Sequence, residues 1–241
     1  MKEITTKGLL ARVFFPTTVL TASYIVLGHF CRIPQILLFC ILAFLVLFPS
    51  EVAMILIASK RDFGAFSLKS AFIGHKKMPL WKILMIALFF FGIAGLLSSF
   101  VAPLELRILA PLREALLKIL PKGFDWTDFA HIKTYPRALL ILSCVIYAIT
   151  NVLVGPMVEE LFFRGYLTSH YGKQNKFTPI LIAILFSMYH FWLPFNNVFR
   201  ILLMAPISYV AYRKKNIYIC ICFHCMCNIF STANFIMAVV G

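Results

Sequence analysis

Long apolar runs constrain the possible fold of this chain more than any other feature of its sequence. A helix needs about 20 apolar residues to cross a bilayer, and such runs recur between residues 13 and 239. Hydrophobic residues make up 61% of the 241 residues and charged residues 13%, whereas soluble domains average about 45–50% and about 25%. We therefore expect an all-α, polytopic transmembrane helix bundle. Seven spans are predicted, at residues 13–30, 33–59, 80–103, 138–163, 177–194, 197–212 and 216–239.

The N-terminal run has two interpretations. Lys2, Lys7 and Arg12 precede apolar residues, as in a signal peptide, but Pro16 interrupts the run and apolar character continues to Phe30. We favour an uncleaved first span. With no linker or internal repeat, residues 1–241 are expected to form a single integral membrane domain.

The net charge of +14 indicates topology rather than nucleic-acid binding. Most Lys and Arg residues lie on one side of the bundle if the N-terminus is inside the cell, which is the usual bias of cytoplasmic loops. Residues 104–120 mix Leu and Ile with charges and a Pro, and are expected to form a helix that lies on the outer surface or dips into it. The sequence thus predicts a multi-pass protein of the bacterial cytoplasmic membrane, with the bilayer as a partner and no nucleic acid.

Two adjacent carboxylates, Glu159 and Glu160, lie with Arg164 inside the fourth apolar run. A charged residue within a span costs about 2.5–3.5 kcal/mol, so it normally faces the bundle interior and has a role there. Glu160 and Arg164 are one helical turn apart and are expected to pair, whereas Glu159 is rotated by about 100° and faces another neighbour. Pro156 just upstream weakens the helix where a wet cavity is expected.

Other polar residues lie within predicted spans. His190 follows Phe186 by one turn, and Asn228 follows His224 by one turn. A carboxylate near a histidine in a partly wet pocket is suited to taking a proton from water, and a second histidine with an amide could donate to an oxyanion. This set is what hydrolysis of a peptide bond requires. Glu51 follows Pro49 and is expected to cap a kink rather than to join the site.

These motifs resemble the CAAX protease and bacteriocin-processing family of intramembrane endopeptidases, also called the abortive-infection or type II CAAX prenyl endopeptidase family. The motif E-E-x-x-x-R corresponds to Glu159, Glu160 and Arg164, F-x-x-x-H to Phe186 and His190, and H-x-x-x-N to His224 and Asn228. The resemblance covers residues 138–235, the motif-bearing peptidase core. Family members usually have eight spans, so an eighth is an open alternative to the seven counted here.

The resemblance implies an intramembrane endopeptidase that acts on a protein or peptide at the membrane, with or without a lipid attached. Glu159 resembles the base that activates water, assisted by His190, and His224 with Asn228 resembles the oxyanion-stabilising pair. Glu160 and Arg164 would position the first motif. No cofactor is assured: we favour a metal-free glutamate mechanism, although two histidines and a glutamate could hold a zinc ion.

Several alternatives stay open from the sequence. The chain could be a non-catalytic bacteriocin-immunity or scaffold protein that keeps the motifs for folding, or a transporter that uses Glu159 and the histidines as a proton relay. Seven cysteines, an odd number, give no disulfide framework. Cys220, His224 and Cys227 share one helix face and could bind a soft metal.

Overall fold

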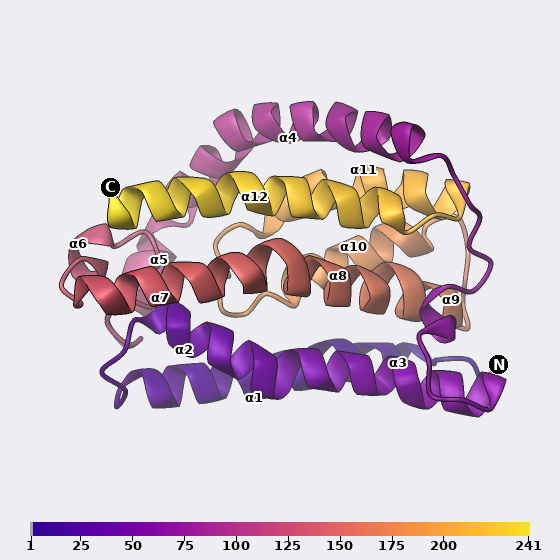
Figure 1. Ribbon diagram of the computed structural model, residues 1–241, viewed down its shortest axis with the longest axis horizontal. Coiled ribbons are helices and arrows are strands. Elements are labelled where there is room, and N and C mark those ends of the chain that lie inside the picture. Colours follow the sequence, from indigo (N-terminus) through magenta and orange to yellow (C-terminus); the bar gives the residue numbers. More distant parts are fainter. Residues whose placement is uncertain (1) are drawn as a thin grey trace.

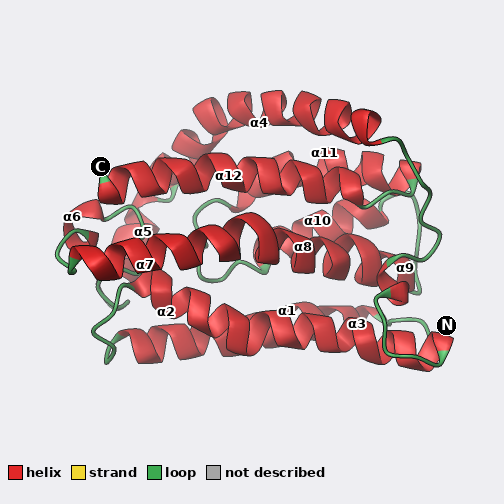
Figure 2. Cartoon of the chain, in the orientation of Figure 1, coloured by secondary structure: helices red, strands yellow, loops and turns green. Residues whose placement is uncertain are grey.

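The computed structural model describes residues 2–241 as a bundle of roughly parallel and antiparallel helices, with the two ends of the chain at opposite ends of the bundle (Figure 1). Within those residues no strand is formed (Figure 2), and the one β-bridge joins Ile4 to Tyr171. An all-α polytopic bundle is therefore confirmed. The long helical segments are α1 (Thr6–Gly28), α2–η1–α3 (Gln35–Leu42, Ala43–Leu47 and Phe48–Phe63), α4 (Leu80–Ile108), α7–η3–α8–η4–α9 (Arg137–Ala148, Ile149–Val154, Gly155–Glu160, Leu161–Leu167 and Thr168–His170), α10 (Thr178–Met188), α11 (Asn197–Lys214) and α12 (Tyr218–Val240).

Five of these segments are long and apolar enough to cross a membrane. They are α1, α2–α3, α4, α7–α9 and α12. The other two helices, α10 and α11, also fall at predicted spans. However, α10 is short, with 11 residues, and α11 carries Arg200, Arg213 and Lys214 among its 18 residues. Since α10 rises only about 16 Å, it covers about half of a bilayer core about 30 Å thick.

The predicted fifth span, residues 177–194, is a helix only as far as Met188. His190 was expected on this helix and instead lies in the loop after it. The loop is partly packed inside the protein: Tyr189 and Trp192 are buried, whereas Phe191 is exposed. The apolar run continues through the loop, so hydropathy alone does not reveal the helix end. Non-helical backbone at this depth is tolerated where protein rather than lipid surrounds it.

The predicted surface segment 104–120 is divided in the structure. Its first residues end α4, and a separate helix, α5 (Ala110–Leu117), follows with no buried residue. Glu105 is not a surface residue: it is buried and accepts the backbone N–H groups of Val198 and Phe199 at 2.9 and 2.8 Å. A carboxylate there caps the N-terminus of α11. α4 lies along the outside of the bundle against α11 and α12 (Figure 1).

The short segments lie at the two ends of the bundle. The 3₁₀ turn η2 (Lys69–Ala71) packs near η4, and α6 (Phe129–Ile132) lies near the C-terminus. Most buried apolar side chains form one core, and Phe162, Phe163 and Phe186 are among its largest fully buried members. Phe186 packs against Arg164 of the first motif.

Candidate active site

The helix that carries the first motif changes its hydrogen-bonding pattern on both sides of the glutamates. Residues Ile149–Val154 and Leu161–Leu167 are π-helical, with α8 (Gly155–Glu160) between them. A Cβ atom at Gly155 would lie only 2.9 Å from the backbone oxygen of Thr150. The close approach of the two backbone segments therefore requires a residue without a side chain at position 155. π-Bulges occur frequently at functional sites. The sequence suggested a weakened helix at Gly155 and Pro156 but not the π-helical segments.

Glu160 is the centre of a buried ionic cluster. Its Oε1 atom accepts from Arg164 Nη1 at 3.1 Å and from His224 Nδ1 at 2.9 Å. Arg164 also donates from Nε to Ser208 at 3.1 Å, and its guanidinium lies 4.2 Å from the ring centre of Phe186. The expected pair of Glu160 with Arg164 is thus present, and it joins α8, η4, α11 and α12.

Glu159 points to a different side of the helix from Glu160 and is almost fully buried. Its Oε2 atom lies 3.9 Å from His224 Nε2, too far for a direct hydrogen bond. His224 therefore lies between the two glutamates, with one nitrogen bound to Glu160 and the other facing Glu159. The space between His224 and Glu159 has the separation that one small polar molecule would bridge.

His190 is held by the end of its own helix. Its Nδ1 atom lies 2.7 Å from the backbone oxygen of Phe186. A carbonyl oxygen only accepts, so Nδ1 carries the hydrogen and Nε2 of the neutral ring is left as an acceptor. The ring packs against Phe186, Tyr189 and Trp192. The structure brings His224, rather than His190, into direct contact with the glutamates.

Asn228 lies one turn after His224 on α12. Its Nδ2 atom donates to the backbone oxygen of Asn151 at 2.7 Å and lies 3.4 Å from Asn151 Oδ1. Asn151 in turn donates to Thr232 at 2.9 Å. The amide of Asn228 therefore joins α12 to η3 and is not hydrogen-bonded to either glutamate.

Several polar residues around the site lie outside the three motifs, and the sequence analysis did not assign them to the site. Glu51 does not cap its own helix: its side chain is fully buried and accepts the hydroxyl of Tyr189 at 2.7 Å, so that interpretation was wrong. Ser208 and Asn151 hold Arg164 and Asn228. The cost of a charge within a span was the one sequence signal for Glu51, whereas a single Ser or Asn in an apolar run gives little signal.

Within residues 2–241 no three His, Cys, Asp or Glu side chains are grouped so that they could hold an ion. His190 Nδ1 and His224 Nδ1 are both directed at oxygen acceptors, and Cys220 Sγ lies 3.8 Å from the backbone oxygen of Ile207. These contacts occupy Nδ1 and leave Nε2 of both histidines free. The zinc and soft-metal alternatives therefore stay predictions, and no step below uses a metal.

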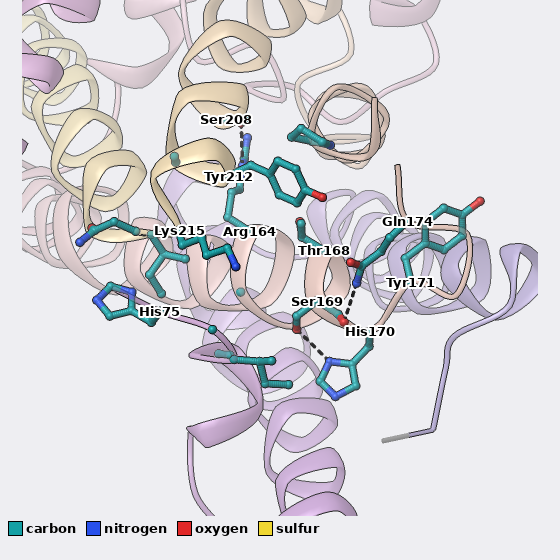
Figure 3. A pocket seen from close by; sticks show the side chains of 18 of the residues that line it. His75, Arg164, Thr168, Ser169, His170, Tyr171, Gln174, Ser208, Tyr212 and Lys215 are labelled. Atoms are coloured by element: carbon teal, nitrogen blue, oxygen red, sulfur yellow. Dashed lines mark hydrogen bonds between the residues drawn. The ribbon is translucent and has the colours of Figure 1, made fainter. Parts of the chain in front are cut away.

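A pocket of about 870 Å³ is lined by Arg164 and Ser208 and, near the N-terminus, by Lys2 and Glu3 (Figure 3). Glu159 and His224 are not among its lining residues. Arg164 and Ser208 line its inner end, and Lys215, Tyr212 and Gln174 are among its other lining residues. Arg164 therefore links the buried cluster to a cavity with room for a small ligand.

The long apolar helices and the three motifs agree with the expectation of a membrane-embedded peptidase. Residues 141–230 match the family model described as Type II CAAX prenyl endopeptidase Rce1-like. All three motifs lie within the match, so this part of the chain is an Rce1-like domain and the resemblance seen in the sequence is confirmed. No curated protein and no solved structure matches the chain. At the general level the match implies an intramembrane CAAX-type endopeptidase with a protein substrate at the membrane, and the five apolar helices indicate a multi-pass integral membrane protein.

Proposed function

We propose that the protein hydrolyses a peptide bond of a membrane-associated protein or peptide precursor, with Glu159 as the base that activates water. One observation carries this assignment. Glu160 is neutralised by Arg164 and His224, whereas Glu159 is buried beside His224 Nε2 with no hydrogen-bond donor among residues 2–241 at bonding distance. Glu159 is therefore the carboxylate that is left to bind a water molecule.

In the proposed reaction, water between Glu159 and the substrate loses a proton to the Glu159 carboxylate as its oxygen bonds to the peptide carbon. The free Nε2 acceptor of His190 assists by orienting this water. The carbonyl oxygen becomes an oxyanion, and the C–N bond then breaks as the proton passes from Glu159 to the leaving nitrogen. The products are a new carboxylate end and a new amine end.

The oxyanion is assigned to His224 and Asn228. A protonated His224 donates from Nε2 while Nδ1 stays on Glu160, and a buried donor that is already oriented is worth far more than one in water. Asn228 joins when the substrate displaces its 3.4 Å contact with Asn151 Oδ1. Glu160 and Arg164 act through His224 and are positioning residues.

Isotope labelling tests the hydrolysis directly. Membranes that contain the wild type, Glu159→Gln or Glu114→Gln are incubated in oxygen-18 water, and their peptides are sequenced by mass spectrometry. We expect new C-terminal carboxyl groups with one heavy oxygen for the wild type and for Glu114→Gln, which alters an exposed residue of α5. Equal labelling with Glu159→Gln would rule out the proposed base, and no labelling with any protein would favour a scaffold.

We propose further that a lipid is attached near the cleaved bond, in line with the prenyl substrates that the family description names. Peptide pairs that differ only in a prenyl group on one cysteine test this. A higher kcat/KM for the lipidated member supports the proposal, and equal values contradict it.

The N-terminus is proposed to lie inside the cell, because basic residues gather at that end of the bundle. A cysteine introduced at Lys7 tests this orientation: in intact cells it should be protected from a membrane-impermeant thiol reagent.

A further inference from the structure

The loop between α10 and α11 carries His190 and is held by one side chain of α11. Arg200 Nη1 donates to the carbonyl oxygen of Ser187 at 3.1 Å, and Arg200 Nη2 donates to that of Leu193 at 3.3 Å. Ser187 and Leu193 lie three residues before and three residues after His190. The guanidinium therefore spans the loop, with His190 at the midpoint.

The two residues that Arg200 binds also hold the backbone of His190. The N–H of His190 donates to the same carbonyl oxygen of Ser187 at 3.3 Å, and the N–H of Leu193 donates to the carbonyl oxygen of His190 at 2.9 Å. A shift of the guanidinium would therefore displace the His190 backbone.

Asn197 fixes the guanidinium in turn. Arg200 Nη1 also donates to Asn197 Oδ1 at 3.2 Å, and Asn197 Nδ2 donates to the carbonyl oxygen of Pro194 at 3.0 Å. Within residues 2–241 Arg200 is not part of an ion pair. The contacts of its side chain thus serve the loop rather than an acidic partner.

The chemistry of arginine suits this task. A guanidinium presents its donors in a rigid fork and can bind two carbonyl oxygens at a fixed separation, whereas the ammonium group of lysine is a single point on a flexible stem. A cap on the last turn of α10 would explain the bond to Ser187. It does not explain the bond to Leu193, which lies in the loop beyond the end of that helix.

We propose that Arg200 is a positioning residue for the peptidase: by fixing the loop, it holds the His190 ring where Nε2 accepts from the water beside Glu159. The ring is oriented by Nδ1 on the carbonyl oxygen of Phe186 at 2.7 Å, so the backbone of the loop decides where Nε2 lies. This inference rests on the proposed function, because it gives Arg200 a part in the same reaction.

Other contacts to the loop act at a different point. The Thr17 hydroxyl donates to the carbonyl oxygen of Tyr189, and Glu51 accepts the Tyr189 hydroxyl. These two contacts anchor one residue in the middle of the loop, whereas Arg200 holds both of its ends.

A double-variant cycle tests whether Arg200 acts through His190. The initial rate of oxygen-18 incorporation into new peptide C-termini is measured in membranes with equal amounts of the wild type, Arg200→Lys, His190→Gln or the double variant. We expect Arg200→Lys to slow labelling by about tenfold to a hundredfold, since misplacing a catalytic group by about 1 Å costs about a hundredfold. In the His190→Gln background the same change should have little further effect. Arg107→Lys makes the same replacement at an exposed residue of α4 and should label as fast as the wild type.

A second variant and a second measurement complete the test. Asn197→Ala removes one acceptor of Arg200 Nη1 and should slow labelling less than Arg200→Lys does, again only while His190 is present. It provides the same cycle should Arg200→Lys fail to accumulate. Hydrogen exchange on the full chain in detergent should rise for the N–H groups of His190 and Leu193 in Arg200→Lys and not in Arg107→Lys.

The outcomes separate this inference from the proposed function. Equal losses from Arg200→Lys with and without His190 would overturn the inference, because Arg200 would then act on the fold as a whole. A wild-type rate for Arg200→Lys, or unchanged exchange at both N–H groups, would overturn it as well. Absence of labelling by the wild type would instead overturn the proposed function, and the inference with it.

Discussion

His224 Nδ1 and Arg164 Nη1 bind the same oxygen atom of Glu160, at 2.9 and 3.1 Å. The three side chains are buried and come from two helical segments far apart in the sequence. Glu160 therefore fixes the distance between the first and third motifs. Without this carboxylate, His224 would be free to turn away from Glu159.

We predict that Arg164→Met lowers the free energy of unfolding by about 3–5 kcal/mol, because it leaves the Glu160 carboxylate buried with one cation fewer. The double variant Glu160→Gln with Arg164→Met should cost less than the sum of the single changes. Unfolding by titration with a denaturing detergent in mixed micelles measures both. Additive losses would mean that the two side chains do not stabilise each other.

A second prediction concerns Glu51 and Tyr189, which join α3 to the loop that carries His190. Tyr189→Phe removes the hydroxyl that donates to Glu51 across 2.7 Å, so a buried acceptor is left unpaired, and stability should fall by about 1–3 kcal/mol. Replacing both partners, as Glu51→Leu with Tyr189→Phe, should recover part of this loss, as the same unfolding titration will show. A double variant as unstable as the worse single one would contradict the pairing.

The sequence predicted the features that depend on local spacing. Glu160 and Arg164 are four residues apart, and side chains at that spacing meet on a helix whatever surrounds them. The apolar runs likewise predicted the helical segments, because a bilayer requires a continuous apolar length. Both interpretations used only residues that are close together in the chain.

Contacts between distant residues could not be predicted in this way. Glu51 meets Tyr189 across 138 positions, and Asn228 meets Asn151 across 77. His190 lies beyond the end of α10 although apolar residues continue past it. The helix ends where tertiary contacts hold the loop, such as the hydrogen bond from the Thr17 hydroxyl to the carbonyl oxygen of Tyr189. The composition of an apolar run does not reveal such contacts.

A third prediction tests the cap of α11. Glu105 accepts two backbone N–H groups at the start of this helix, so Glu105→Gln should lower the unfolding free energy by about 1–2 kcal/mol. The matched control Glu114→Gln changes an exposed residue of α5 and should stay within about 0.5 kcal/mol of the wild type. Hydrogen exchange should rise for the N–H groups of Val198 and Phe199 in Glu105→Gln alone. Unchanged exchange there would show that the carboxylate is not the cap.

A fourth prediction concerns Gly165, the residue after Arg164. A Cβ atom at this position would lie 2.5 Å from the backbone oxygen of Ala71 and 2.8 Å from its Cβ atom. Ala71 belongs to the buried η2 turn, where Ser70 donates to Ile55 and receives from Ser59, so the turn has little freedom to move away. Gly165→Ala should therefore lower the unfolding free energy by about 1–3 kcal/mol through overpacking.

Gly92 on α4 is the matched control. A Cβ atom at Gly92 would have no other atom within 4 Å, so Gly92→Ala should raise the unfolding free energy by up to about 1 kcal/mol. Titration with a denaturing detergent measures the unfolding free energy of both variants and the wild type. If Gly165→Ala is as stable as the wild type, η2 does not pack against the motif helix as closely as these distances require.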